Sequence, residues 1–207
     1  MILALLEIIL VFIGIPLLYK YDFIPFHKSI PLAIVFLLYL AILLTDKKFT
    51  RKYFTMNGFR KWKPVIIRTT VFFLLSVCFV AYFKPENLFI IVKEKPFIWI
   101  MIMIFYPVWS AYPQELIYRA YFFHRFSKYA NNKLILIIIN SLLFSFSHII
   151  FNNWIALILT FAGNFFLVNT YRKSNSLMVV FIEHAVYGNI IFTTGLGEYF
   201  YLPMSAG

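Results

Sequence analysis

Long apolar runs separated by short polar and basic segments dominate this chain. A helix that crosses a bilayer needs about 20 mostly apolar residues, and seven runs approach or exceed that length. We expect membrane-spanning helices at about residues 2–19, 30–45, 64–83, 97–127, 133–151, 154–171 and 176–194. The first run lacks the basic start and the small-residue cleavage site of a signal peptide, so we interpret it as a retained helix.

Composition agrees with this pattern. Hydrophobic residues make up 62% of the 207 residues and charged residues 13%, against roughly 45–50% and 25% in a soluble domain. Such a chain cannot cover its apolar surface in water, which excludes a soluble globular protein and a disordered chain. The single cysteine, Cys78, excludes a disulfide scaffold. We therefore predict an all-α fold: a polytopic transmembrane helix bundle of about seven spans, in which residues 1–207 form a single transmembrane domain.

The net charge of +11 lies mainly in the segments between the runs, where it indicates contact with an anionic lipid surface. We therefore expect the lipid bilayer as a partner and no nucleic acid. The loop 47–63 alone holds seven Lys and Arg residues. Because basic loops favour the cytoplasmic side, the pattern predicts the N-terminus inside and the C-terminus outside. The expected location is the membrane, most simply the bacterial cytoplasmic (plasma) membrane.

The fourth run is longer than a bilayer requires. Residues 97–127 would form a helix of about 46 Å, against a hydrocarbon thickness of about 30 Å. Pro107 and Pro113 each remove a backbone donor, so we expect them to kink or break this helix. Backbone groups freed at membrane depth need protein or a water-filled cavity beside them. The stretch just before Gln114 is therefore expected to border a cavity.

Ionisable side chains deep in a membrane are costly and usually face the interior of the bundle. Glu7 and Arg68 have no charged neighbour in the sequence, and we interpret them as structural. Glu115 and Arg119 are four residues apart, so they share a helix face in the order that favours an ion pair. The other candidates are His148, Glu183 and His184.

Three of these groups are expected at one depth. Glu115 and His148 lie about 16 residues on either side of the turn near 131–132, and His184 lies about 10 residues beyond the basic end of the sixth run. A carboxylate and two imidazoles can activate a water molecule and stabilise an oxyanion with no cofactor. The same three side chains, Glu115, His148 and His184, could instead bind a divalent metal such as zinc. They lack the H-E-x-x-H spacing that is typical of zinc peptidases.

The residues around these groups resemble three motifs of the CPBP (Abi) family of intramembrane endopeptidases. That family comprises the type II CAAX prenyl proteases and bacteriocin-processing or immunity proteins. Residues 113–119 (P-Q-E-L-I-Y-R) resemble its E-E-x-x-x-R motif, residues 144–148 (F-S-F-S-H) its F-x-x-x-H motif, and residues 184–189 (H-A-V-Y-G-N) its H-x-x-x-N motif. We interpret residues 1–95 as accessory spans and residues 96–195 as the CPBP-like catalytic core.

The resemblance implies hydrolysis of peptide bonds in membrane-associated proteins or peptides. In this mechanism Glu115, or the pair of Gln114 and Glu115, activates water together with His148. His184 and a nearby asparagine stabilise the oxyanion, and Arg119 orders the first motif by pairing with Glu115.

Two positions depart from the family pattern. Gln114 replaces the first Glu of the pair, and an amide cannot accept a proton as a carboxylate does. Glu115 points about 100° away on an ideal helix, so it needs a kink to take over that role. Gly188 stands where the family has Asn, and Asn189 follows one residue later. A distortion at Gly188 would be needed to bring Asn189 to the site, and Glu183 is a further carboxylate that could compensate.

Three functions follow from these features. The leading prediction is an intramembrane endopeptidase, a peptide hydrolase that resembles the CAAX proteases. The alternative is a non-proteolytic CPBP-like membrane scaffold or immunity protein, which Gln114 and Gly188 favour. The third is a transporter, in which polar side chains within the runs line a path: Asn140, Asn164 and Asn169. Hydrogen bonds between helices are a simpler interpretation of these asparagines.

Overall fold

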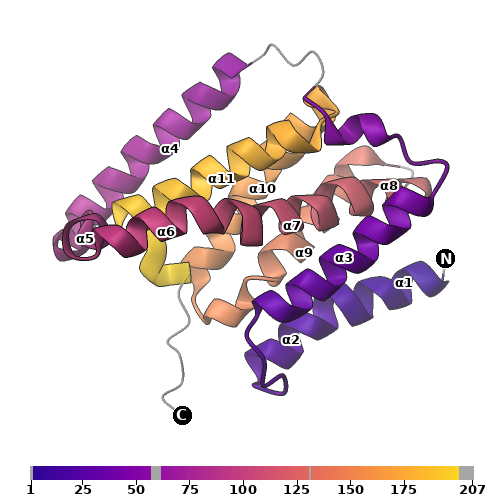
Figure 1. Cartoon of the computed structure of the whole chain (residues 1–207), viewed down its shortest axis with the longest axis horizontal. Coiled ribbons are helices and arrows are strands. Elements are labelled where there is room, and N and C mark those ends of the chain that lie inside the picture. The colour runs from indigo at the N-terminus through magenta and orange to yellow at the C-terminus, as the bar shows by residue number, and fades with distance from the viewer. Residues whose placement is uncertain (1, 57–61, 131, 201–207) are drawn as a thin grey trace.

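The structure is a computed structural model that describes residues 2–56, 62–130 and 132–200. Over these residues every regular element is helical (Figure 1), which confirms the predicted all-α fold. In the described part of the chain, six helices are long and apolar enough to cross a membrane, and they match the predicted runs within three residues at each end: Ile2–Lys20, Trp62–Phe83, Pro96–Tyr129, Lys133–Phe151, Trp154–Ser174 and Leu177–Thr194. The remaining predicted run is a shorter apolar helix, Ser29–Thr45.

The first half of the chain supplies the outer helices. The first span consists of α1 (Ile2–Glu7), a π-helical stretch (Ile8–Gly14) and α2 (Ile15–Lys20), and it is followed by α3 (Ser29–Thr45) and α4 (Trp62–Phe83). The rings of Phe12 and Tyr39, both buried, join the first span to α3. A short α5 (Ile90–Glu94) then leads into the long fourth span.

The long span continues without a break through both of its prolines. It consists of α6 (Pro96–Tyr106), a π-helical stretch (Pro107–Ala111), α7 (Tyr112–Glu115), a second π-helical stretch (Leu116–Tyr121) and α8 (Phe122–Phe126). Figure 1 shows α6, α7 and α8 following one another across the molecule. The structure therefore shows no break at either proline, and the predicted kink stays a prediction. In the wide π-helical turns beside the prolines the backbone hydrogen-bond pattern shifts by one residue. The helix therefore continues although each proline lacks a backbone N–H.

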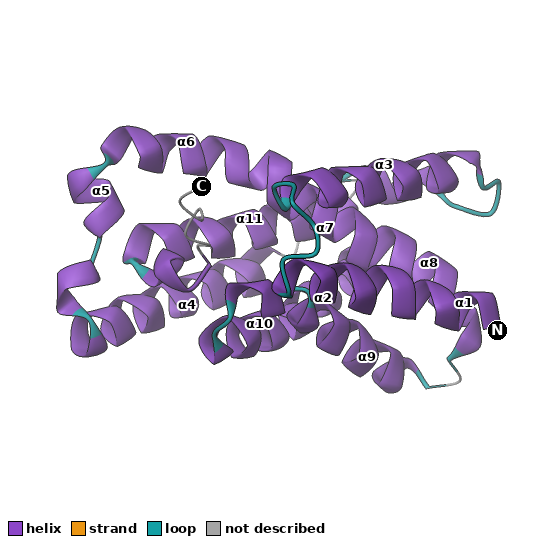
Figure 2. Ribbon diagram, turned by 90° about the horizontal axis from the view of Figure 1, so that it is seen from below, coloured by secondary structure: helices purple, strands orange, loops and turns teal. Residues whose placement is uncertain are grey.

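Three helices of the C-terminal half pack against this long span. They are α9 (Lys133–Phe146), α10 (Trp154–Ser174) and α11 (Leu177–Thr194), and each begins with a polar side chain that accepts a backbone N–H: Asn132, Asn153 and Ser176. Such caps satisfy backbone donors that a helix start leaves unpaired. Helix α11 packs against α4, α6 and α10. Figure 2 shows that helix makes up nearly all of the described chain.

Candidate active site

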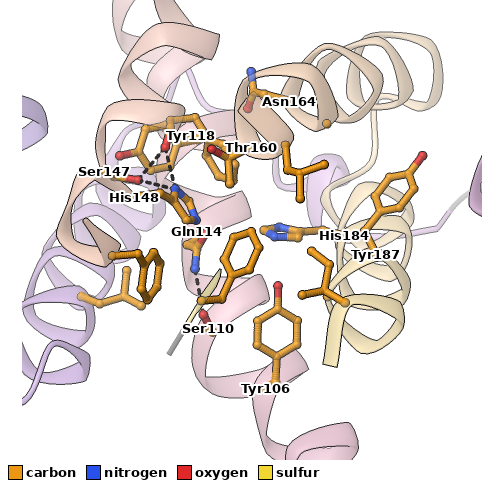
Figure 3. Close-up of a pocket in the computed structure, with 18 of the residues that line it drawn as sticks. Tyr106, Ser110, Gln114, Tyr118, Ser147, His148, Thr160, Asn164, His184 and Tyr187 are labelled. Atoms are coloured by element: carbon orange, nitrogen blue, oxygen red, sulfur yellow. Dashed lines mark hydrogen bonds between the residues drawn. The ribbon is translucent and has the colours of Figure 1, made fainter. Parts of the chain in front are cut away.

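A cavity of about 970 Å³ lies within the bundle, between the long span, α11 and the outer helices. Its wall is mostly apolar, and the predicted site residues Gln114, His148 and His184 all line it. Figure 3 shows these three side chains around one space, together with Tyr106 and Ser110. The stretch just before Gln114 therefore borders a cavity, as the sequence predicted.

Glu115 and Arg119 form a fully buried ion pair next to this cavity. Both side chains are 0% exposed, and Arg119 places Nη2 3.2 Å from Glu115 Oε1 and Nε 3.0 Å from Oε2. Glu115 itself does not line the cavity. The helix continues through Pro113, and Glu115 is directed at Arg119 and His184. Glu115 is thus positioned to hold other side chains, and Gln114 is the member of the pair that faces the cavity.

Buried asparagines fix Arg119 against the neighbouring helices. Arg119 Nη1 donates to Asn140 Oδ1 at 3.1 Å, and Asn140 Nδ2 donates to the carbonyl of Tyr118 at 2.9 Å. Asn164 Nδ2 donates to Asn140 Oδ1 at 3.1 Å and to Ser141 Oγ at 2.7 Å. Asn140 therefore joins α9 to the long span, and Asn164 joins α10 to α9, by hydrogen bonds between helices.

His184 connects α11 to the same carboxylate. Its Nδ1 lies 2.8 Å from Glu115 Oε1. An ionised carboxylate only accepts hydrogen bonds, so Nδ1 carries the proton and donates it. Glu115 is thereby held between the guanidinium of Arg119 and the imidazole of His184, and the Nε2 edge of His184 is left for the cavity.

His148 has a different partner at its Nδ1. It follows the end of α9 and its Nδ1 lies 2.8 Å from the carbonyl oxygen of Phe144. A carbonyl also only accepts, so Nδ1–H donates and the neutral ring has its lone pair on Nε2. The Phe144 ring contacts both imidazoles, with centroid distances of 5.0 Å to His148 and 5.8 Å to His184. Both histidines are thus oriented through Nδ1.

Gln114 is held by a residue one turn earlier on the same helix. Its Nε2 donates to Ser110 Oγ at 2.8 Å, while its Oε1 is buried and accepts no hydrogen bond from the described residues. Sequence reasoning missed Ser110 and Tyr106 as part of this site. The signal was present, because Tyr106, Ser110 and Gln114 follow one another at intervals of four residues and so share a helix face.

The structure does not bring Asn189 or Glu183 to the cavity. Helix α11 runs from Leu177 to Thr194, with no distortion at Gly188, and Asn189 is not among the residues that line the cavity. Glu183 Oε1 instead accepts hydrogen bonds from Arg68 Nη2 at 2.8 Å and from the Tyr187 hydroxyl at 3.0 Å. Arg68 and Glu183 thus form a structural ion pair between α4 and α11.

No three His, Cys, Asp or Glu side chains gather as a metal site in the described part of the chain. Glu115 points toward Arg119 and His184, while His148 is turned toward its own helix. A zinc site made of Glu115, His148 and His184 stays a prediction that this arrangement does not favour.

Comparison with known families was consistent with the three motifs. Residues 94–190 match the family model of the Rce1-like type II CAAX prenyl endopeptidases. Over this segment the chain is similar to that family. The match confirms the resemblance drawn from the motifs, all of which it contains. No curated protein and no solved structure gave a match.

The apolar helices indicate an integral membrane protein, and the family that residues 94–190 match is generally one of proteases. Residues outside this segment also line the cavity. Lys28, from the loop before α3, lines the cavity and places its ammonium 4.4 Å from the centre of the Phe151 ring. The N-terminal spans therefore contribute to this cavity.

We expect Lys28 to lose its charge at an unusually low pH. Burial lowers the pKa of Lys28 to about 8, against about 10.4 for an ordinary lysine. The folded state thus favours the neutral amine, so raising the pH from about 8 toward 10.4 should stabilise the fold. Amine labelling followed by mass spectrometry, with the exposed Lys52 as reference, should show Lys28 becoming reactive around pH 8. Reactivity that begins only near pH 10 would contradict this assignment.

Proposed function

We propose that the protein is an intramembrane endopeptidase that hydrolyses peptide bonds of membrane-associated proteins or peptides. The observation that carries this proposal is that two imidazoles reach one cavity with different Nδ1 partners, a carbonyl for His148 and a carboxylate for His184. These different partners suit two roles, a general base for His148 and a hydrogen-bond donor for His184.

His148 is the base in this mechanism. With Nδ1–H donated to the Phe144 carbonyl, its neutral ring directs the Nε2 lone pair to the cavity. As the water oxygen attacks the carbonyl carbon of the substrate, its proton passes to Nε2 of His148. When the C–N bond breaks, His148 returns that proton to the leaving amine, so the enzyme ends the cycle unchanged.

His184 is the electrostatic partner. Its Nδ1 is held by Glu115 Oε1, so in the charged form of the ring Nε2–H can donate to the cavity. In that form the cluster holds one carboxylate between two cations, Arg119 and His184. This excess of positive charge, in a low-dielectric site, complements the oxyanion that forms on the attacked carbonyl.

Gln114 lines the cavity but does not take the proton of the water. Its Nε2 is fixed by Ser110, and its Oε1 is buried. Because an amide does not accept the proton, His148 alone carries that role. The reaction can therefore be completed without a carboxylate at position 114.

The cavity is suited to a substrate that arrives through the lipid. Several apolar side chains of its wall are exposed, including Val71 and Leu75 of α4 and Phe97 and Trp109 of the long span. An apolar segment of a substrate can lie against such side chains without leaving an apolar environment.

A comparison of protein N-termini in cells tests the proposal. Membranes from cells that express wild type or His148→Ala at equal levels are analysed for new protein N-termini. We expect N-termini that appear only with wild type, and they would identify the substrate. If no such N-termini appear in cells that contain the natural substrates, the protein is a non-proteolytic scaffold or immunity protein instead.

A further inference from the structure

Gly188 leaves room for a side chain from another helix. A Cβ atom built at this position would overlap the Tyr106 ring at Cε1, Cζ and the hydroxyl oxygen. Position 188 is where the third motif of the family has its asparagine. Tyr106 of α6 therefore occupies the space that the asparagine side chain would need, and its hydroxyl lies at the same end of the cavity as His184 (Figure 3).

Tyr106 is held firmly by its ring and left free at its hydroxyl. The ring makes edge contacts with His184, at a centroid distance of 6.3 Å, and with Phe192, at 5.5 Å. The hydroxyl makes no hydrogen bond to any residue that the structure describes, while the side chain lines the cavity. An unpaired hydroxyl in an apolar environment is costly, so it indicates that a molecule in the cavity supplies its partner.

We propose that Tyr106 is a catalytic residue that donates its hydroxyl hydrogen bond to the oxyanion, beside His184. This inference rests on the proposed peptidase function. In the tetrahedral intermediate the negatively charged oxygen accepts one hydrogen bond from Tyr106 O–H and one from His184 Nε2–H. No proton is transferred and no bond to Tyr106 forms or breaks. The tyrosine thus supplies the donor that Gly188 lacks.

Gly188 and Tyr106 then form a matched pair. Any side chain at 188 collides with the ring, and the ring needs the absence of a side chain at 188 in order to reach the cavity. A purely structural role for Tyr106 would depend on the ring alone. A catalytic role depends on the hydroxyl, and the two roles are separated by a substitution that removes only the oxygen.

The decisive variant is Tyr106→Phe. With purified protein and the substrate found by the comparison of N-termini, we expect kcat to fall by about 10²–10³-fold, the effect of losing one oxyanion donor. KM and the level of folded protein should stay close to wild type, because the ring remains. Tyr112→Phe is the matched control, since Tyr112 lies on the same span and does not line the cavity. It should keep the wild-type kcat.

A paired substitution decides the question if Tyr106→Phe does not reach the membrane. Tyr106→Ala opens the space at 188, and Tyr106→Ala with Gly188→Asn places an amide donor there. We expect the double variant to be at least about tenfold more active than Tyr106→Ala, a fraction of what one donor contributes. Equal activity of these two variants would overturn the proposal in that case.

The outcomes separate this inference from the proposed function. Wild-type kcat in Tyr106→Phe overturns the role of the hydroxyl and leaves the peptidase function standing. If wild type cleaves nothing that His148→Ala leaves intact, the peptidase function is wrong and this inference is overturned with it.

Discussion

Replacement of His148 by alanine is expected to lower kcat by about 10²–10⁴-fold, the usual contribution of a general base. The reason is that Gln114 cannot take the proton of water, and Glu115 lies outside the cavity wall, turned toward Arg119 and His184. No other base with a free lone pair is placed beside the water in the proposed mechanism. The measurement is the rate of peptide release by purified protein at saturating substrate.

The same substitution should leave the fold intact. The hydrogen bonds of His148 are local, to the carbonyl of Phe144 and to Ser147 Oγ at 3.2 Å, and their loss should cost only about 1 kcal/mol. His124→Ala is the matched control, because His124 lies at a separate small pocket, where its Nε2 is 2.7 Å from Asp46 Oδ2. It should keep full activity. Wild-type cleavage by His148→Ala would show that the base has been assigned to the wrong residue.

Replacement of Arg119 by leucine is expected to cause the largest loss of stability. Arg119 is fully buried, and its removal leaves the Glu115 carboxylate without a guanidinium partner and the Asn140 Oδ1 without one of its donors. Breaking one side of a buried ion pair costs about 3–5 kcal/mol in the free energy of unfolding. Thermal unfolding in detergent, together with the yield of folded protein from membranes, measures the loss.

Two further variants make this prediction specific. Arg125→Leu breaks the more accessible pair with Glu7, in which the side chains are 29% and 16% exposed, and it should cost less. Arg119→Leu combined with Glu115→Gln removes both charges, so it should recover part of the lost stability. It should not recover activity, because His184 then has no carboxylate partner. An Arg119→Leu protein as stable as wild type would refute the structural role of the pair.

The sequence was sufficient for the long apolar helices and for bringing three of the predicted site residues to one cavity. Each apolar run became a helix because backbone groups in lipid can be satisfied only within the segment itself. Counting residues from the turn near 131–132 placed the region of Glu115 level with His148, and the cavity indeed contains Gln114, His148 and His184. The membrane orientation of the termini stays a prediction.

Only the tertiary structure decided which member of each neighbouring pair faces the cavity. Gln114 faces it and Glu115 does not, while Gly188 lines it and Asn189 does not. The contact between Gly188 and Tyr106 joins residues 82 positions apart, and no local sequence pattern predicts it. In a soluble protein an apolar stripe marks the buried face of a helix. In a bilayer the outer face is apolar as well, so the pattern leaves the rotation of each helix open, and packing between helices sets it.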